Sequence, residues 1–299
     1  MGSALTTIGL PVALGIIMLG LGLSLTLADF ARVLKQPKAV IIALVCQLIL
    51  LPGICFGLVL LFQLPPVLAV GMMMLAASPG GTTANLYSHL FRGDIALNIS
   101  LTAVNSVIAV ITLPLITNFA IAYFQPFDNQ LGLQWAKALE VFAIVLLPVA
   151  VGMLIRRLWP SFADGMDKPV RIASVVILIV VIAGAVASNW ALLVANFTQL
   201  ALITVLFCLI SLTIGFFVPR WLKVGRRQAV ATSFEIGIHN ATLAIVIAQS
   251  VLGSVELSLP AAVYGVLMFF IAFGFGFLIR DRQTAADSMP VATEGRQPA

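Results

Sequence analysis

Glu235 is the residue of this sequence whose position most clearly demands chemistry. It lies inside a long apolar stretch, between residues 229–232 and 241–248, and it is the only carboxylate that cannot be assigned to a loop or a helix end. A charged side chain at the centre of a bilayer costs roughly 2.5–3.5 kcal/mol on insertion scales, so it is rarely present without a partner or a function. The following residues add Gly237, His239 and Asn240. A carboxylate, an imidazole and an amide within one apolar stretch predict a cation site at membrane depth.

A second set of polar side chains lies on an otherwise apolar segment. Asn98, Thr102 and Asn105 follow the spacing i, i+4, i+7, which places them on one face of a helix. Such side chains could simply form hydrogen bonds between helices. Together with Asn85 and Glu235, however, they would provide the oxygen ligands that a hard cation such as sodium prefers. The carboxylate would offset the charge of the ion, and the ion would offset the cost of burying the carboxylate.

Two more polar side chains leave alternatives open, and a third has a single interpretation. Gln47 is an isolated amide in an apolar run, where it could be a ligand or form a hydrogen bond to a neighbouring helix. His239 is four residues after Glu235, so it could pair with that carboxylate, bind a cation or carry a proton. His89 lies beside Arg92 near the end of an apolar segment and is interpreted as an interfacial residue without a special role.

The composition identifies the solvent in which these residues must function. Of the 299 residues, 61% are hydrophobic and 9% are charged, and the mean hydropathy is +1.13. Because a soluble domain carries about 25% charged residues, a bilayer must surround much of this chain. The net charge of +5 does not indicate nucleic-acid binding, because the basic residues form short clusters between apolar stretches. Cys46, Cys55 and Cys208 are isolated and are expected to be small core residues.

The elements that must position these residues are membrane-spanning helices. A helical span needs about 20 apolar residues. The sequence contains nine such segments, so we predict an all-α polytopic membrane protein. Their approximate ranges are 5–27, 38–62, 66–90, 95–123, 135–156, 170–189, 194–218, 227–252 and 260–279.

The basic residues predict the orientation of the nine spans. All lysines and arginines except Lys137 fall on one side of the membrane. Basic residues accumulate on the cytoplasmic side, so the C-terminus should be cytoplasmic and the N-terminus outside, in the inner (plasma) membrane of the cell. Residues 280–299 are polar and mixed, and they are predicted to form a disordered cytoplasmic tail.

Two of the predicted spans are interrupted. The third contains a proline and two glycines followed by hydroxyl and amide side chains, over 78–85, and the eighth contains the polar stretch 235–240. Non-helical backbone at membrane depth is tolerated only where it faces protein or a water-filled cavity. A pair of interrupted helices, one in each half, is typical of an inverted-repeat secondary transporter. The alternative for the third span is a simple kink at Pro79-Gly80-Gly81.

The two interruptions also carry a resemblance to a known family. The stretch PGGTTAN at 79–85, followed by Arg92-Gly93, and the stretch EIGIHN at 235–240 resemble motifs of the bile acid:sodium symporter family, and the similarity covers nearly the whole chain. It implies a bacterial member that lacks the first helix of ten-helix relatives. It also implies two crossed broken helices within a transmembrane domain over 1–279, divided into a panel of about 1–62 and 135–189 and a core of about 66–123 and 194–279.

The resemblance further implies two sodium sites and a substrate site. The first sodium site would be formed by Asn85, Asn98, Thr102 and Glu235. The second would be formed by Gln47, Glu235, His239 and the carbonyl groups of Ile236 and Ile238. The substrate would contact Thr82 and Asn240.

This chain departs from the pattern of the family at several positions. Ala84 and Asn98 each replace a serine of bacterial relatives, and His239 replaces a glutamine. A protonated His239 would repel sodium, so the second site is expected to be weaker, pH-dependent or adapted to protons. Some relatives offer a His-Asn pair from the last helix, where this chain has Met268-Phe269-Phe270, and this argues against bile-acid-like recognition by that pair.

These observations favour sodium-coupled symport of a small organic anion by alternating access. Sodium is the coupling ion, no other cofactor or metal is expected, and the partners are the anion, sodium ions and membrane lipid, with no nucleic acid. The alternative is a proton-coupled carrier or exporter in which Glu235 and His239 form a proton relay. An enzyme is not expected, because no nucleophile–base pair, phosphate loop or metal motif is present. The sequence does not determine the substrate or the oligomeric state.

Overall fold

The protein is an all-helical, multi-pass membrane protein, as its composition predicts. The computed structural model describes residues 9–124 and 135–280, so the predicted tail beyond Arg280 and the start of the first predicted span lie outside the described residues. Within the described part, five helical segments are long and apolar enough to cross a membrane. A sixth is obtained when α2 (Leu10–Ser24) is joined to the bent segment Leu27–Lys35 that follows it. Pro66–Ala77 and Ala241–Val251 are shorter apolar helices.

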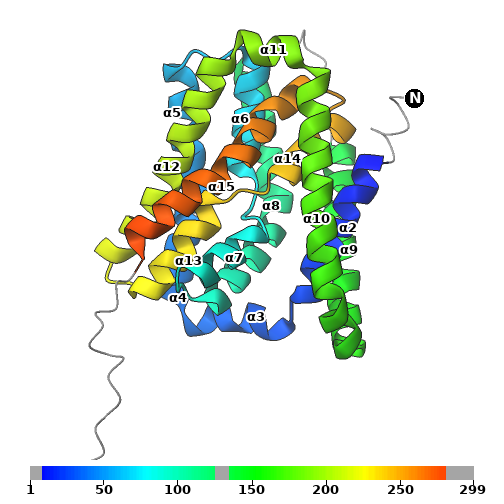
Figure 1. Ribbon diagram of the computed structural model, residues 1–299, viewed down its shortest axis with the longest axis vertical. Helices are drawn as coiled ribbons and strands as arrows, with labels where there is room; N and C mark the ends of the chain where they lie inside the picture. Colours follow the sequence, from blue (N-terminus) through cyan, green and yellow to red (C-terminus); the bar gives the residue numbers. More distant parts are fainter. Residues whose placement is uncertain (1–8, 125–134, 281–299) are drawn as a thin grey trace, which may run out of the picture.

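Three helices form one side of the molecule. α2, α9 (Trp135–Leu158) and α10 (Pro160–Ser188) pack against one another and lie side by side on the right of Figure 1. α10 begins at Pro160, ten residues before the predicted span, because proline is well accommodated in the first turn of a helix. Pro169, which the sequence places at a joint between spans, therefore lies inside the helix.

The remaining helices form a second group around the two helix interruptions. They are α4 (Pro37–Val45), the π-helical turn η3 (Cys46–Leu50), α5 (Leu51–Leu61), α6 (Pro66–Ala77), α7 (Thr83–Leu90), α8 (Ile95–Phe124), α11 (Trp190–Ala195), α12 (Phe197–Trp221), α13 (Arg226–Gly237), α14 (Ala241–Val246) with the π-helical turn η4 (Ile247–Val251), and α15 (Leu259–Ile279).

The segment 37–61 packs within this second group, whereas the resemblance implies a panel that includes it, over about 1–62 and 135–189. Its helices pack against α6, α8, α12 and α13. The chain turns by 68° between α2 and the segment that begins with α3 (Leu27–Arg32). α3 packs against α8, so the crossing from the first group to the second occurs before residue 37.

Both predicted interruptions are present, and they contact each other directly. α6 ends at Ala77 and α7 begins at Thr83, while α13 ends at Gly237 and α14 begins at Ala241. The two extended segments form an antiparallel bridge between Gly80 and His239. The Gly81 N–H donates to the Ile238 carbonyl at 2.7 Å, and the Asn240 N–H donates to the Pro79 carbonyl at 2.9 Å. Each break therefore satisfies backbone groups of the other, which a simple kink would not do.

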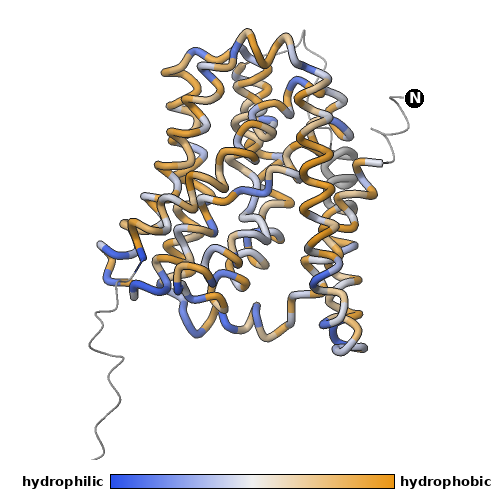
Figure 2. The backbone as a smooth tube through the Cα atoms, in the orientation of Figure 1, coloured by the Kyte–Doolittle hydropathy of each residue, from blue (hydrophilic) through white to orange (hydrophobic). Residues whose placement is uncertain are grey.

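Hydrogen bonds join three chain connections at the lower end of the molecule in Figure 1. The Asp94 carboxylate accepts from the Leu97 N–H at 3.0 Å and from Gln36 Nε2 at 3.1 Å, and the Asp94 N–H donates to the Arg227 carbonyl at 2.8 Å. Gln228 Nε2 donates to Gln36 Oε1 at 2.8 Å. The connections before α4 and α8 and the first turn of α13 are thus tied together at an end where hydrophilic residues gather (Figure 2).

The close packing of α2 on α9 gives a first prediction. A Cβ atom on Gly152 would lie 2.5 Å from the Leu19 carbonyl oxygen and 2.7 Å from the Leu23 backbone nitrogen. Both are backbone atoms, so a change of side-chain rotamer cannot relieve the clash. We expect Gly152→Ala to lower the free energy of unfolding by roughly 1–3 kcal/mol, as overpacking does. Thermal unfolding of the purified protein in detergent measures the change.

Gly184→Ala in α10 is the matched control, because no packing neighbour among the described residues lies within 4 Å of the position that an added Cβ atom would take. Alanine is the better helix former, so this variant should unfold at the same or a slightly higher temperature than the wild type. Equal unfolding temperatures for the two variants would contradict the close packing of α2 on α9.

Candidate functional site: a buried carboxylate between two helix breaks

The Glu235 carboxylate lies where α8, α13 and the first break meet. The side chain is fully buried in the last turn of α13. Thr102 Oγ1 donates to Glu235 Oε2 at 2.5 Å, and Asn105 Nδ2 donates to Glu235 Oε1 at 3.2 Å. Gly80 packs so closely that a Cβ atom there would collide with the carboxylate and lie 2.6 Å from the Glu235 carbonyl oxygen. Thr102 and Asn105, which their spacing places on one face of α8, therefore both meet Glu235.

Several amide oxygens near the breaks have no hydrogen-bond donor. Within the described part of the chain, four such oxygens are buried and unpartnered, and they belong to Gln47, Asn85, Asn98 and Asn105. A buried acceptor left unsatisfied costs about 1–3 kcal/mol. These oxygens lie on η3, α7 and α8, and the buried carboxylate lies on α13. Amide and carboxylate oxygens are the ligands that an alkali cation needs, so the site fits a desolvated monovalent cation.

The side-chain hydrogen bonds of Asn98 go to groups other than Glu235, although the resemblance assigns both residues to one site. Its Nδ2 atom donates to the Ala231 carbonyl at 2.9 Å and to Ser88 Oγ at 2.6 Å. These bonds fix the amide nitrogen toward α13 and α7 and leave the amide oxygen available. Asn98 therefore joins three helices and keeps a free acceptor. Ser88 has no role in the prediction from sequence.

Gln47 and His239 converge on the carbonyl group of Ser78. Gln47 Nε2 lies 2.9 Å and His239 Nδ1 lies 3.2 Å from that oxygen. Because a carbonyl oxygen can only accept a hydrogen bond, His239 Nδ1 must carry the proton. In the neutral imidazole, Nε2 then has no proton and carries a lone pair that can accept a hydrogen bond. Within the described residues Nε2 is buried without a partner. The ring stacks on Phe207 with 5.5 Å between centroids and meets the edge of Tyr264 at 5.4 Å.

The other predicted residues lie at the crossing of the breaks. The Ile238 carbonyl accepts the Gly81 N–H, while Ile236 lies in the last turn of α13. Asn240 caps α14, because its Oδ1 atom accepts the Leu243 N–H at 3.0 Å. Both Asn240 and Thr82 line a small hollow between the crossing and α10.

A larger cavity adjoins this hollow and separates the two groups of helices. It has a volume of about 370 Å³, and Thr82 and Asn85 line one wall while Ser24 of α2 and Ser174 of α10 line the other. A cavity of this size suits a small organic molecule. Thr82 and Asn85, which are predicted to bind substrate and cation respectively, thus share one cavity.

Two residues of this region are missed or misjudged from the sequence. Asn105 forms a hydrogen bond to Glu235, although the sodium ligands implied by the family do not include it. Its position on the polar face of α8 is the sequence signal for this contact. His89 is interpreted from the sequence as interfacial, yet it lines the cavity. Its spacing of seven residues from Thr82 is the signal for a shared helix face.

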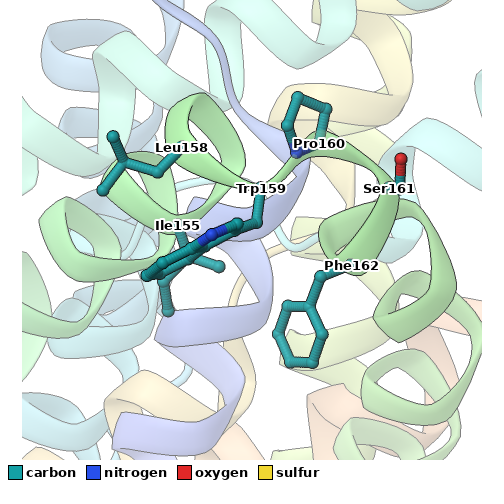
Figure 3. A pocket seen from close by; sticks show the side chains of 6 residues that line it. All are labelled: Ile155, Leu158, Trp159, Pro160, Ser161 and Phe162. Carbon is teal, nitrogen blue, oxygen red and sulfur yellow. The ribbon is translucent and has the colours of Figure 1, made fainter.

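Another hollow lies at the connection of α9 to α10. Its lining is mainly apolar and aromatic and consists of Ile155, Leu158, Trp159, Pro160, Ser161 and Phe162 (Figure 3). Trp159 and Phe162 are more than half exposed, and Arg156 nearby pairs with Asp164. Exposed aromatic rings beside charged residues are typical of the membrane–water interface. The cavity beside the breaks, which has convergent polar groups, is therefore the candidate functional site.

Comparison with known proteins supports a transport role for this arrangement. The profile of the family described as "Sodium Bile acid symporter family" matches residues 11–196. The chain is 30% identical over 258 residues to a probable sodium/metabolite cotransporter, BASS1, of Arabidopsis thaliana chloroplasts, covering 85% of this chain and 62% of that protein. It is 26% identical over 257 residues to the probable sodium/metabolite cotransporter BASS2 of rice chloroplasts, covering 86% and 60%.

A bacterial protein is also similar. The chain is 25% identical over 255 residues to YocS of Bacillus subtilis, named as an uncharacterized sodium-dependent transporter, covering 85% of this chain and 78% of that protein. The chain spans less than two thirds of the length of the two plant relatives.

The contact between Gly80 and Glu235 gives a second prediction. Gly80→Ala must push the carboxylate away from Thr102 and Asn105, so any stabilisation of the protein by sodium should be lost. Gly81→Ala is the matched control, because its Cβ atom would meet neighbours only at 3.4 Å or more. Thermal unfolding in sodium chloride and in potassium chloride compares the two variants. Sodium stabilisation that survives in Gly80→Ala would contradict the role of this contact.

Proposed function

Because this chain belongs to the sodium bile acid symporter family, we propose that it is a sodium-coupled symporter of a small organic anion. Membership in a family of transporters agrees with the expectation that the chain is not an enzyme. The observation that carries the proposal is the fully buried Glu235 carboxylate of α13 together with buried amide oxygens on η3, α7 and α8 that lack donors. A bound sodium ion would compensate the carboxylate and satisfy those oxygens at the same time.

Two sodium positions account for the two groups of polar side chains. The first uses Asn85, Asn98, Thr102 and Glu235, and Asn105 holds the carboxylate in place. The second uses Gln47, Glu235, His239 and the carbonyl groups of Ile236 and Ile238. The convergence of Gln47 and His239 on one carbonyl oxygen supports a common site for these two side chains.

The substrate position lies at the crossing of the breaks, against Thr82 and Asn240. Within the described residues, no lysine, arginine, aspartate or glutamate lines the cavity. The starts of α7 and α14 follow Thr82 and Asn240 directly, and the N-terminal ends of helices favour negative charge. Backbone N–H groups and these two side chains would therefore bind the anionic group of the substrate.

Alternating access would move the two groups of helices against each other. We assign α2, α9 and α10 to a panel and the helices around the breaks to a core, within nine spans related by an inverted repeat. The N-terminus would lie outside and the C-terminus in the cytoplasm of a cell bounded by this plasma membrane, which agrees with the hydrophilic lower end seen in Figure 2. Sodium would order the crossing and set Thr82 and Asn240 for the substrate.

Glu235→Gln tests the sodium sites. A ligand present at a hundredfold excess over its Kd stabilises the folded state by about 2.7 kcal/mol, so sodium chloride should raise the unfolding temperature of the wild type relative to potassium chloride. We expect Glu235→Gln to lose most of this difference. Glu256→Gln changes an exposed glutamate outside the site and should retain it. Equal sodium responses in both variants would refute a cation site at Glu235.

Uptake into proteoliposomes tests the coupling ion. A set of radiolabelled small organic anions should accumulate only with an inward sodium gradient and not with potassium in its place. Accumulation driven by a pH gradient without sodium would instead support the proton-coupled carrier with Glu235 and His239 as the relay. Sodium-independent uptake that persists in Glu235→Gln would exclude sodium symport.

A further inference from the structure

His89 lies on the face of α7 that forms one wall of the cavity. Thr82, Asn85, Leu86 and His89 follow the spacing i, i+3, i+4, i+7, and all four line the 370 Å³ cavity. This spacing places side chains in a row along one helix face. At a rise of 1.5 Å per residue, His89 stands about 10 Å along the axis from Thr82. The wall thus has a polar group at the crossing and a second one at its far end.

The space between these ends is mostly apolar. Leu86 lies between Asn85 and His89, and the opposite wall carries Leu21 of α2 together with Val170 and Val175 of α10. Ser24 of α2 also lines the cavity, but its hydroxyl donates to the Leu21 carbonyl at 2.7 Å. Its hydrogen is therefore engaged within its own helix. Ser174 of α10 also lines the hollow at the crossing and so lies toward the other end, which leaves His89 as the side chain best placed to donate at the far end.

The His89 imidazole is available to a ligand. The residue is exposed, and its side chain makes no hydrogen bond, ion pair or ring contact with the described residues. His239 differs, because its ring is buried between aromatic residues and bonded to Ser78. With no carboxylate on the described lining of the cavity to accept its N–H, His89 can donate to an oxygen of a bound molecule.

We propose that His89 is a specificity-determining residue of the substrate site. It binds a second oxygen-bearing group, a hydroxyl or a carboxylate, of an elongated organic anion whose charged head is held at Thr82 and Asn240. The apolar stretch of the cavity holds the hydrocarbon between the two groups. This inference rests on the proposed function, since it requires that the cavity beside the breaks holds the substrate.

Binding of three matched acids tests this inference. Octanoate, ω-hydroxyoctanoate and suberate share a chain length, and only the last two carry oxygen at the far end. Binding to the purified full-length protein in sodium chloride is measured by calorimetry. The wild type should bind an oxygenated acid roughly five- to tenfold more tightly than octanoate, as one additional hydrogen bond allows. His89→Leu should reduce this preference below about twofold without weakening octanoate.

His89→Gln retains a side-chain donor and should restore part of the preference, which loss of folding or of general packing would not do. The inference is overturned if the wild type binds all three acids equally or binds none, or if His89→Leu weakens all three alike. The sodium-dependent rise in unfolding temperature, measured on the same samples and on Glu235→Gln, reports on the proposed function separately. If the unfolding temperature responds normally to sodium but His89 does not discriminate between the acids, only the proposed contact of His89 with the substrate is overturned, and the proposed function is not.

Discussion

The burial of one carboxylate is the constraint on which the rest of this structure depends. Glu235 has no exposed surface, and two side chains of α8 donate to it. A carboxylate at such depth must be compensated, because isolated charges are costly in a low-dielectric interior. The surrounding architecture serves this need. Gly80 has no side chain where one would collide with the carboxylate, and the chain is interrupted on both sides of this contact, between α6 and α7 and between α13 and α14.

The interruptions in turn require each other. An extended segment within a bilayer needs partners for its N–H and C=O groups, and here each break supplies them to the other through the pairing of Gly80 with His239. The hydrogen bonds of Asp94 tie the connection before α8 to the start of α13 at the lower end of the molecule. Side chains on α7, α8 and α13 are therefore held in one frame, which is what a core that moves against α2, α9 and α10 as a unit would need.

The proposed transport cycle places different chemistry on the two sides of this frame. The carboxylate of α13 and the buried amide oxygens of η3, α7 and α8 that lack donors suit a small cation, whereas the cavity next to the breaks is largely apolar with a few polar groups. Because Gly80 packs on the carboxylate while the next residues, Gly81 and Thr82, line the hollow at the crossing, sodium binding and substrate binding would be coupled through the position of the breaks. The similarity to proteins named as sodium/metabolite cotransporters is consistent with this division.

Local patterns in the sequence determined the helical membrane class, the positions of both breaks, the buried carboxylate and the polar face of α8, because each depends on composition or spacing within one segment. The tertiary structure alone decided which segments meet. Gln47 and His239 are separated by nearly two hundred residues, and their convergence on the Ser78 carbonyl has no local signal. The same holds for the packing of segment 37–61 among the helices of the second group and for the placement of His89 in a cavity. Helix periodicity specifies a face, but only the packing of distant helices specifies what that face contacts.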